Sequence, residues 1–371
     1  MIADSRIQNL AKILVHYSTQ VQAKDRVMIR GFPLEPSAEP LVMEVVREVL
    51  RAGGYPHLRM TPSGYMQMCL SEASDHQLEY IDPLTRMTAE DFEVDIRITS
   101  TSNTRGLGSR HSQKMQIAQK ATRDLIRRWM QRSAAGELRW VATRYPTNAN
   151  AQDAEMSLPA YLDFFYRSCF ADQDDPVTAW KEIERKGHSI LERLRGRQHY
   201  HLRGPDIDLK MSLAERTLIV DAGQNNIPDG EIFTGPVEDS VEGWVRFSYP
   251  CIRLGTEVDG VELTFKAGKV IQATATKNEA FLLQQLDLDA GARVIGELGI
   301  GLNHMIQRFT KNMLFDEKIA GTIHLALGAG YPESGSLNTS VIHWDMLVDM
   351  RHGGQITADD ELIYENGAFI F

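Results

Sequence analysis

The stretch Arg26-Val27-Met28-Ile29-Arg30 is a short apolar run between two arginines, and it predicts a buried β-strand. Before it, apolar residues spaced along one face between Ile7 and Val15 predict an amphipathic helix. After it, residues 39–51 predict a second helix, which Gly53-Gly54 ends. The chain therefore opens with strands and helices in alternation.

The alternation continues through the first half of the chain. Further strands are predicted at 56–60, 94–100 and 138–142, and helices near Gln77 and at 113–131, 157–170 and 175–195. Strands that alternate with helices favour a parallel sheet covered on both faces. We therefore predict an α/β fold with a doubly wound N-terminal domain.

The pattern changes near residue 198, where short strands separated by turn residues take over. These strands are predicted at 206–211, 217–221, 243–248, 260–266 and 270–276. Asp259-Gly260 and Ala267-Gly268-Lys269 are expected to be hairpin turns. We place the boundary near Gly196, with an N-terminal α/β domain at 1–196 and a β-rich α+β domain at 197–371.

Composition excludes several classes of partner. The 371 residues carry a net charge of −10, so there is no basic surplus to neutralise nucleic-acid phosphates. No apolar run is long enough for a membrane span, and the N-terminus lacks a basic region followed by an apolar stretch. The cysteines number three, with no Cys-x-x-Cys pair, which is typical of a reducing compartment. We expect a cytoplasmic protein that binds neither nucleic acid nor membrane.

The first indication of a functional site is the motif His343-Trp344-Asp345. In a strand, side chains alternate between faces, so His343 and Asp345 point the same way, about 7 Å apart along the chain. Two such groups on one rigid face can hold a divalent metal. A single polar residue in an apolar run is more often a satisfied core group, but the pair raises the expectation of a metal site.

Three further polar residues, Glu231, Glu297 and His324, lie in runs that otherwise read as buried. Burying such groups is costly unless they are paired or bind a metal. Together with His343 and Asp345 they form an oxygen and nitrogen ligand set, which suits zinc, cobalt, manganese or iron. Five ligands with three carboxylates exceed the needs of one catalytic zinc, whereas two metals that share a bridging carboxylate would account for the number.

Four blocks of sequence resemble the thermophilic metallo-aminopeptidases of the aminopeptidase T and aminopeptidase S type, a leucyl aminopeptidase-like group. The blocks are Asn-Ile-Pro-Asp-Gly-Glu-Ile-Phe-Thr at 226–234, Gly-Glu-Leu-Gly-Ile-Gly-Leu-Asn at 296–303, Ile-His-Leu-Ala-Leu-Gly at 323–328 and Asn-Thr-Ser-Val-Ile-His-Trp-Asp-Met at 338–346. A weaker match covers 10–17 and 38–42.

The resemblance implies a metal-dependent aminopeptidase that uses a water activated by two divalent ions, zinc, cobalt or manganese. The implied ligands are Glu231, Glu297, His324, His343 and Asp345. It also implies that Glu297 doubles as a catalytic carboxylate, that Tyr331 assists catalysis, and that the C-terminal domain is the catalytic one. The implied substrate is a peptide with a free N-terminus, and the implied assembly is a homodimer.

Two alternatives remain open from the residues. A ring-opening dioxygenase of the 2,5-dihydroxypyridine 5,6-dioxygenase type resembles the same family and uses one iron(II), which His324, His343 and Asp345 could hold. The presence of Glu231 and Glu297 argues against it, because an oxygenase needs open coordination positions. The other alternative is a metal-stabilised binding protein without turnover. Metal stoichiometry and activity would separate the three.

Overall fold

The computed structural model describes residues 4–106 and 112–371, so residues 1–3 of the N-terminal stretch considered above lie outside it. Contacts divide the chain into two compact units. Unit 1 contains Met1–Trp180 and Gly223–Pro228, and unit 2 contains Lys181–Ala222 and Asp229–Phe371. Most of helix α9 (Pro176–Leu194) thus belongs to unit 2 by its contacts. The boundary near Gly196, as the limit of separately folding domains, stays a prediction.

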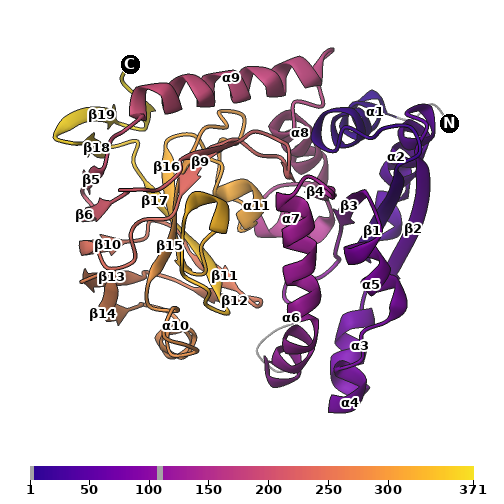
Figure 1. Cartoon of the computed structure of the whole chain (residues 1–371), viewed down its shortest axis with the longest axis horizontal. Coiled ribbons are helices and arrows are strands. Elements are labelled where there is room, and N and C mark those ends of the chain that lie inside the picture. The colour runs from indigo at the N-terminus through magenta and orange to yellow at the C-terminus, as the bar shows by residue number, and fades with distance from the viewer. Residues whose placement is uncertain (1–3, 107–111) are drawn as a thin grey trace. The chain divides into compact units, whose positions relative to one another are not determined.

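Unit 1 is built on a five-stranded sheet in the order β2-β1-β3-β4-β8 (Figure 1). All neighbouring strands run parallel, as predicted. The strands are β1 (Arg26–Leu34), β2 (Tyr55–Pro62), β3 (Val94–Thr99), β4 (Arg139–Arg144) and β8 (Asn226–Ile227). Strand β8 is added by the segment 223–228, which returns from the second half of the sequence to pair with β4.

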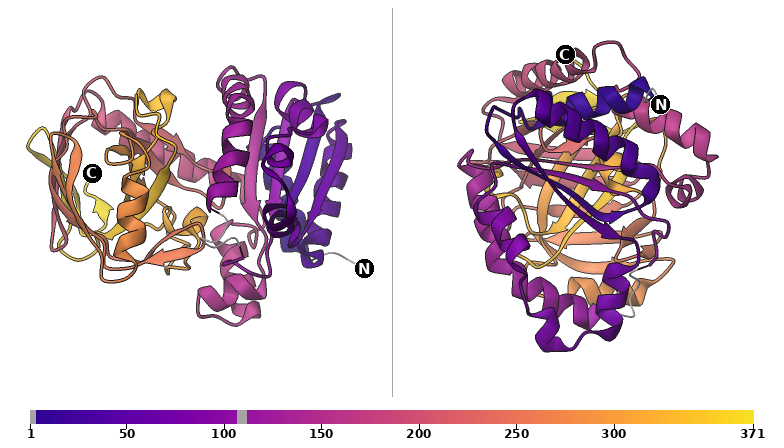
Figure 2. Two further views of the ribbon diagram at one scale, coloured as in Figure 1. Left: turned by 90° about the horizontal axis from the view of Figure 1, so that it is seen from below. Right: turned by 90° about the vertical axis from the view of Figure 1, so that its right-hand side faces the viewer.

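Helices run along both faces of this sheet (Figure 2). Helix α2 (Glu39–Arg51) has the predicted bounds, because its apolar positions repeat at helical spacing and a glycine with positive φ follows at Gly53. Helix α1 (Ser5–Lys12) passes into a π-helical turn, η1 (Ile13–Ser18), which the sequence pattern did not reveal. The other helical elements are η2 (Pro36–Ala38), α3 (Tyr65–Glu72), α4 (Asp75–Leu78), α5 (Pro83–Glu90), α6 (Ser112–Ala134), α7 (Asn148–Asp153) and α8 (Leu158–Ser168).

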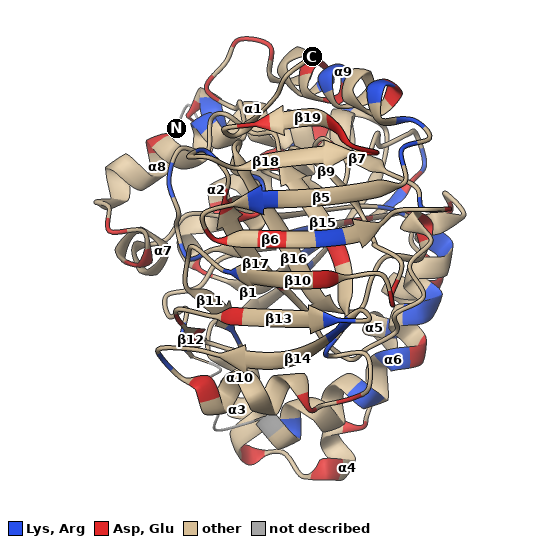
Figure 3. Cartoon of the chain, turned by 90° about the vertical axis from the view of Figure 1, so that its left-hand side faces the viewer, with Lys and Arg blue, Asp and Glu red and all other residues tan. Residues whose placement is uncertain are grey.

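Unit 2 contains an eight-stranded antiparallel sheet in the order β14-β13-β10-β6-β5-β18-β19-β20, which Figure 3 shows face-on with its charged positions coloured. Its strands are β5 (His199–Gly204), β6 (Ile207–Ser212), β10 (Glu242–Arg246), β13 (Glu262–Lys266), β14 (Lys269–Thr274), β18 (Gln355–Ala358), β19 (Glu361–Glu365) and β20 (Ala368–Phe369). Along β6, Leu209 is buried while its neighbours Asp208 and Lys210 are exposed. This alternation gives the sheet one apolar face and one charged face.

The two hairpin predictions have different outcomes. Ala267 and Gly268, both with positive φ, form the tight turn between β13 and β14, as predicted. The prediction at Asp259-Gly260 is wrong. The preceding strand β12 (Thr256–Val258) pairs with β11 (Cys251–Arg253) in a separate two-stranded sheet, so the chain changes sheet at this turn.

A five-stranded antiparallel sheet in the order β17-β16-β15-β9-β7 completes unit 2. Its strands are β7 (Ile219–Asp221), β9 (Glu231–Thr234), β15 (Ile295–Gly301), β16 (Thr322–Gly328) and β17 (His343–Asp349), and the remaining helical elements are α10 (Glu279–Leu286), α11 (Met313–Asp316) and η4 (Pro332–Ser334). Residues of both large sheets, among them Leu209 and Leu325, share one buried apolar core. The opposite face of the five-stranded sheet carries the candidate site.

Among residues 4–106 and 112–371, no helix combines the length and the apolar character needed to cross a bilayer.

Candidate metal centre

The five residues predicted to bind metal lie on one face of the five-stranded sheet. Glu231 is opposite Gly301, His324 is opposite Gly299, and Ala326 stands between Glu297 and Asp345. The structure therefore brings together side chains from β9, β15, β16 and β17, which are more than 100 residues apart along the chain at the extremes. Intervening residues such as Leu325 and Trp344 point to the apolar core on the other side.

A β-bulge in β15 turns Glu297 toward this face. Ile295 pairs with Leu327, but Glu297 pairs with Ala326, so the register shifts by one residue between them. Without the shift, Ile295 and Glu297 would share a face because they are two residues apart. A bulge of this kind re-aims a side chain. Here it allows Ile295 to reach the apolar core while Glu297 faces the site.

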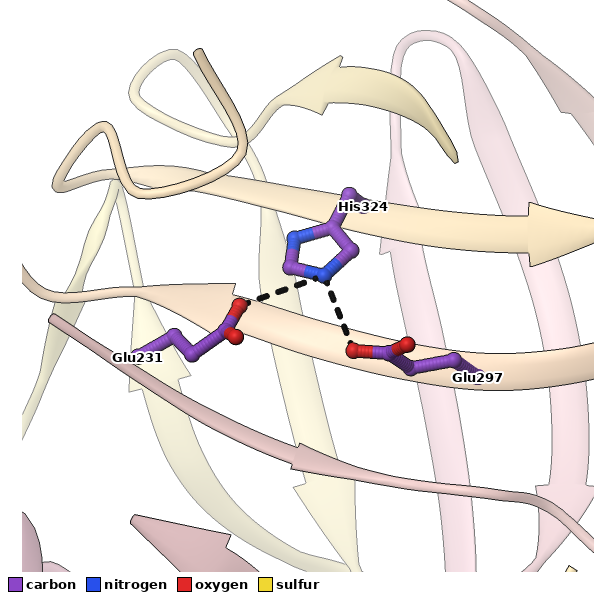
Figure 4. A group of neighbouring side chains, drawn as sticks. All are labelled: Glu231, Glu297 and His324. Atoms are coloured by element: carbon purple, nitrogen blue, oxygen red, sulfur yellow. Dashed lines mark hydrogen bonds and ion pairs between the residues drawn. The ribbon is translucent and has the colours of Figure 1, made fainter. Parts of the chain in front are cut away.

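Glu231, Glu297 and His324 form the first ligand group (Figure 4). His324 Nε2 lies 3.3 Å from Glu231 Oε2 and 3.2 Å from Glu297 Oε1. All three residues are buried, with relative exposures of 4%, 3% and 1%. Their ligand atoms thus converge on one point inside the protein.

Glu297, His343 and Asp345 form the second ligand group. His343 Nε2 lies 3.4 Å from Glu297 Oε2 and 3.3 Å from Asp345 Oδ1. The His343 side chain is 30% exposed, so this group is the more accessible of the two. Glu297 belongs to both groups and turns one oxygen toward each.

Backbone carbonyls orient both imidazole rings. Nδ1 of His324 lies 3.1 Å from the carbonyl oxygen of Glu317, and Nδ1 of His343 lies 2.7 Å from that of Ala329. A proton on each Nδ1 can be donated to these carbonyls, which leaves Nε2 as the nitrogen with a free lone pair. A fixed tautomer of this kind is typical of metal-binding histidines.

The ligand separations fit a divalent ion. Two atoms that share one tetrahedral zinc, each about 2.1 Å from it, lie about 3.4 Å apart, close to the 3.2–3.4 Å found between these side chains. Glu231 Oε2 and Asp345 Oδ1 are also buried without a hydrogen-bond partner. Buried carboxylate oxygens seldom lack a donor, so a cation at each group would satisfy them.

Electrostatics without a metal show how strongly the groups depend on one another. Burial raises the pKa of Glu231 to about 8, although Lys318 and His324 oppose the shift. Burial disfavours the charged form of His343, but Asp345 and Glu297 outweigh it and raise the pKa of His343 to about 10. Likewise burial is outweighed at His324, where Glu297 and Glu231 raise the pKa to about 9. Protons therefore neutralise in part the charge that a metal would neutralise.

Tyr331 lies at the accessible end of the site. Its ring centroid is 5.4 Å from that of His343 and 5.3 Å from that of Phe233. Burial and the negative charges of Glu297 and Asp345 raise the pKa of Tyr331 well above its usual value. The hydroxyl thus keeps its proton and can act as a hydrogen-bond donor.

Lys318 is a member of the site that the sequence did not reveal. Its ammonium is buried between Glu231, Asp229 and Glu317, with Nζ 3.5 Å from Asp229 Oδ1 and 3.0 Å from Glu317 Oε1. Asp229 also groups with Asp221 and Glu231 as a third set of potential ligand atoms. The sequence does not mark Lys318, because two of its three partners, Asp229 and Glu231, lie far from it in the chain.

Comparisons with known proteins identify the family to which the chain is similar. A family model described as thermophilic metalloprotease (M29) matches residues 3–369. Aminopeptidase T of Thermus thermophilus is 32% identical over 229 residues, which cover 54% of this chain and 54% of the relative. Aminopeptidase 2 of Geobacillus stearothermophilus is 30% identical over 275 residues, which cover 62% of this chain and 65% of the relative. The matched segments thus span between about half and two thirds of these relatives.

Among solved structures, wild-type AmpT from Thermus thermophilus superposes with a TM-score of 0.82 at 22% sequence identity, and the match covers 99% of each chain. This likeness confirms the predicted α/β fold with its β-rich second part. The dioxygenase alternative receives no support from these comparisons.

Proposed function

The chain belongs to the thermophilic metalloprotease (M29) family, and we propose that it is a metal-dependent aminopeptidase, which hydrolyses the first peptide bond of a peptide with a free N-terminus. The observation that carries the proposal is Glu297, whose two carboxylate oxygens face two separate ligand groups. A carboxylate shared in this way supports a site for two divalent ions, zinc, cobalt or manganese.

Glu231 and His324 would hold one ion, His343 and Asp345 the other, and Glu297 both. When bound, two such ions lower the pKa of a water molecule and polarise the carbonyl of the scissile bond. Because all donors are oxygen or nitrogen atoms, the set does not favour metals that prefer thiolates.

Glu297 is also the proposed catalytic carboxylate. It would accept a proton from the attacking water and pass it to the amine that leaves, so that one water is consumed for each bond broken. The other carboxylates of the site would attract the free α-ammonium of the substrate, which limits cleavage to the N-terminal residue.

Tyr331 is the proposed donor to the oxyanion that develops on the carbonyl oxygen. Support comes from the position of its ring beside His343 and from the raised pKa that keeps its hydroxyl protonated. A donor in such a position stabilises the transition state more than the substrate. The homodimer and the cytoplasmic location inferred from the resemblance and the composition stay predictions.

The experiment combines metal analysis with turnover. The purified protein should contain about two divalent ions per chain, lose activity on chelation, and regain it with zinc, cobalt or manganese. It should cleave a short peptide and leave the same peptide intact when its N-terminus is acetylated. Full activity without metal would contradict the proposal, and oxygen uptake with one iron per chain would favour the dioxygenase.

A further inference from the structure

Lys318 supplies a buried positive charge beside one of the two ligand groups, and the proposed function gives that charge a specific use. Its side chain is 3% exposed, and it forms ion pairs with Glu231, Asp229 and Glu317. An ammonium has three donors, and here three carboxylates surround it. Because it pairs with Oε1 of Glu231, the other oxygen of that carboxylate is left to face His324.

We propose that Lys318 is a positioning residue that holds Glu231 by one oxygen, so that Glu231 binds the first metal through Oε2 alone. The inference rests on the proposed function, since it assigns a role toward the metal held by Glu231, Glu297 and His324. The ammonium is also the cation of the group Asp221, Asp229 and Glu231. Two members of that acidic group, Asp229 and Glu231, therefore already share one resident cation.

A glycine in β15 allows the backbone segment that carries Lys318 to reach this position. Gly301 is opposite Glu231 in the sheet, and a Cβ on Gly301 would lie 2.1 Å from the carbonyl oxygen of Ile319. Only a glycine allows the segment that contains Lys318 to approach β15 so closely. Asp316, at the end of α11, accepts hydrogen bonds from the backbone N–H groups of Thr310 and Asn312 and so fixes the turn that precedes the segment.

Glu317 and Lys318 together orient both protein ligands that are specific to the first metal. The carbonyl of Glu317 accepts the Nδ1 proton of His324, and the ammonium of Lys318 binds Glu231. The second group has a different support, because His343 donates to the carbonyl of Ala329. Loss of Lys318 should therefore affect the two metals unequally.

The test is Lys318→Met, which keeps an unbranched chain as far as the Cε position and removes the ammonium. Zinc binding to each site is measured by competition with a chelator, and retained zinc by elemental analysis. We expect one of the two ions to bind about 10- to 100-fold more weakly, the range typical for the loss of a group that orients a ligand, while the other changes much less. Lys277→Met, which removes a surface lysine paired with Glu257 at 2.8 Å, is the control and should retain both ions.

The direction of the change in zinc affinity shows whether Lys318 positions Glu231 or acts only as a repelling charge. An ammonium that acted only as a charge would repel the ion, so its removal would tighten zinc binding. Tighter or unchanged binding in folded Lys318→Met overturns the proposal. A wild-type protein that binds none of zinc, cobalt and manganese would contradict the proposed function itself, so the two failures can be distinguished.

A crystal structure of the zinc-loaded wild-type protein provides a test that does not depend on whether the variant folds. The proposal requires Glu231 to bind zinc through one oxygen while the other contacts Lys318. Binding of zinc by both oxygens of Glu231 would overturn it.

Discussion

The eight-stranded and five-stranded sheets of unit 2 are built alike but differ in whether their charged side chains are exposed or buried. Each turns one apolar face to a shared core and a polar face away from it. On the eight-stranded sheet the polar face is exposed, and Glu262 is 44% exposed beside Arg246. On the five-stranded sheet the polar face is buried, and Glu297 is 3% exposed.

A buried charged face therefore needs groups of opposite charge nearby, whereas an exposed face is stabilised by water. Water stabilises Glu262 whether or not Arg246 is near, and exposed ion pairs contribute little to stability. Glu297 has no such solvation, so its charge must be balanced by the neighbouring histidines or by metal ions. The proposed site lies on the sheet whose charged face is buried, and the following experiments probe one face or the other.

The largest effect is expected for Glu297→Gln. The amide keeps the shape of the side chain but cannot serve as a bridging carboxylate or accept a proton, so kcat/KM should fall by about 10³-fold or more, since general-base catalysis alone contributes about 10²–10⁴-fold. Steady-state kinetics on a peptide substrate measures it, with elemental analysis of the metal. The control, Glu262→Gln, should change stability by less than about 0.5 kcal/mol and leave activity intact. If Glu297→Gln and Glu262→Gln changed activity to the same extent, the contrast between the two sheets would be refuted.

Tyr331→Phe should have the next largest effect. It keeps the ring contacts with His343 and Phe233 and removes only the hydroxyl. If the hydroxyl stabilises the oxyanion, kcat should fall by about 10²–10³-fold with metal content and Tm nearly unchanged. A kcat close to that of the wild type would mean that Tyr331 serves only to pack the loop.

Gly296→Ala tests the bulge that aims Glu297. A Cβ at this position would lie 2.2 Å from the carbonyl oxygen of Gly328, so the backbone must move. Displacement of a catalytic group by about 1 Å can cost about 10²-fold in rate, and we expect a loss of about 10- to 100-fold together with a lower Tm. Gly204→Ala, at the end of β5 in the other sheet, is the matched control, because its Cβ would have no contact closer than 3.5 Å. If both variants retain full activity, the bulge does not control the site.

The smallest effect is expected for Asp208→Asn on the exposed face. Asp208 pairs with His201 at 2.7 Å, but its side chain is 60% exposed. We expect a change of less than about 0.5 kcal/mol in the free energy of unfolding, measured by urea denaturation, and no change in metal content. A loss of several kcal/mol would show that the outer face also depends on its charge pairs.

Patterns that are local in sequence predicted much of the fold. The bounds of α2 follow from helical spacing and a terminal glycine, and the β13–β14 hairpin follows from residues that tolerate positive φ. His343 and Asp345 could be assigned to one face because β17 is regular. In each case the decisive interactions lie within a few residues.

The features that the sequence could not predict depend on distant partners. Strand β8 joins a sheet whose other strands lie more than 80 residues earlier in the chain. The bulge at Gly296 exists because of its pairing with β16, and the importance of Lys318 comes from Glu231, which is 87 residues away. Asp259-Gly260 failed as a hairpin because the turn residues were right but the strand that follows pairs elsewhere.

Gly299 has a consequence for how this protein tolerates mutation. The imidazole of His324 lies over it so closely that a Cβ would be 2.0 Å from the ring. Gly299 contributes no functional group, yet any side chain there would displace His324, one of the proposed ligands. In a saturation mutagenesis screen for activity, we expect Gly299 to tolerate substitution as poorly as the proposed metal ligands. The reason would be steric, because the imidazole of His324 occupies the space that a side chain at position 299 would need.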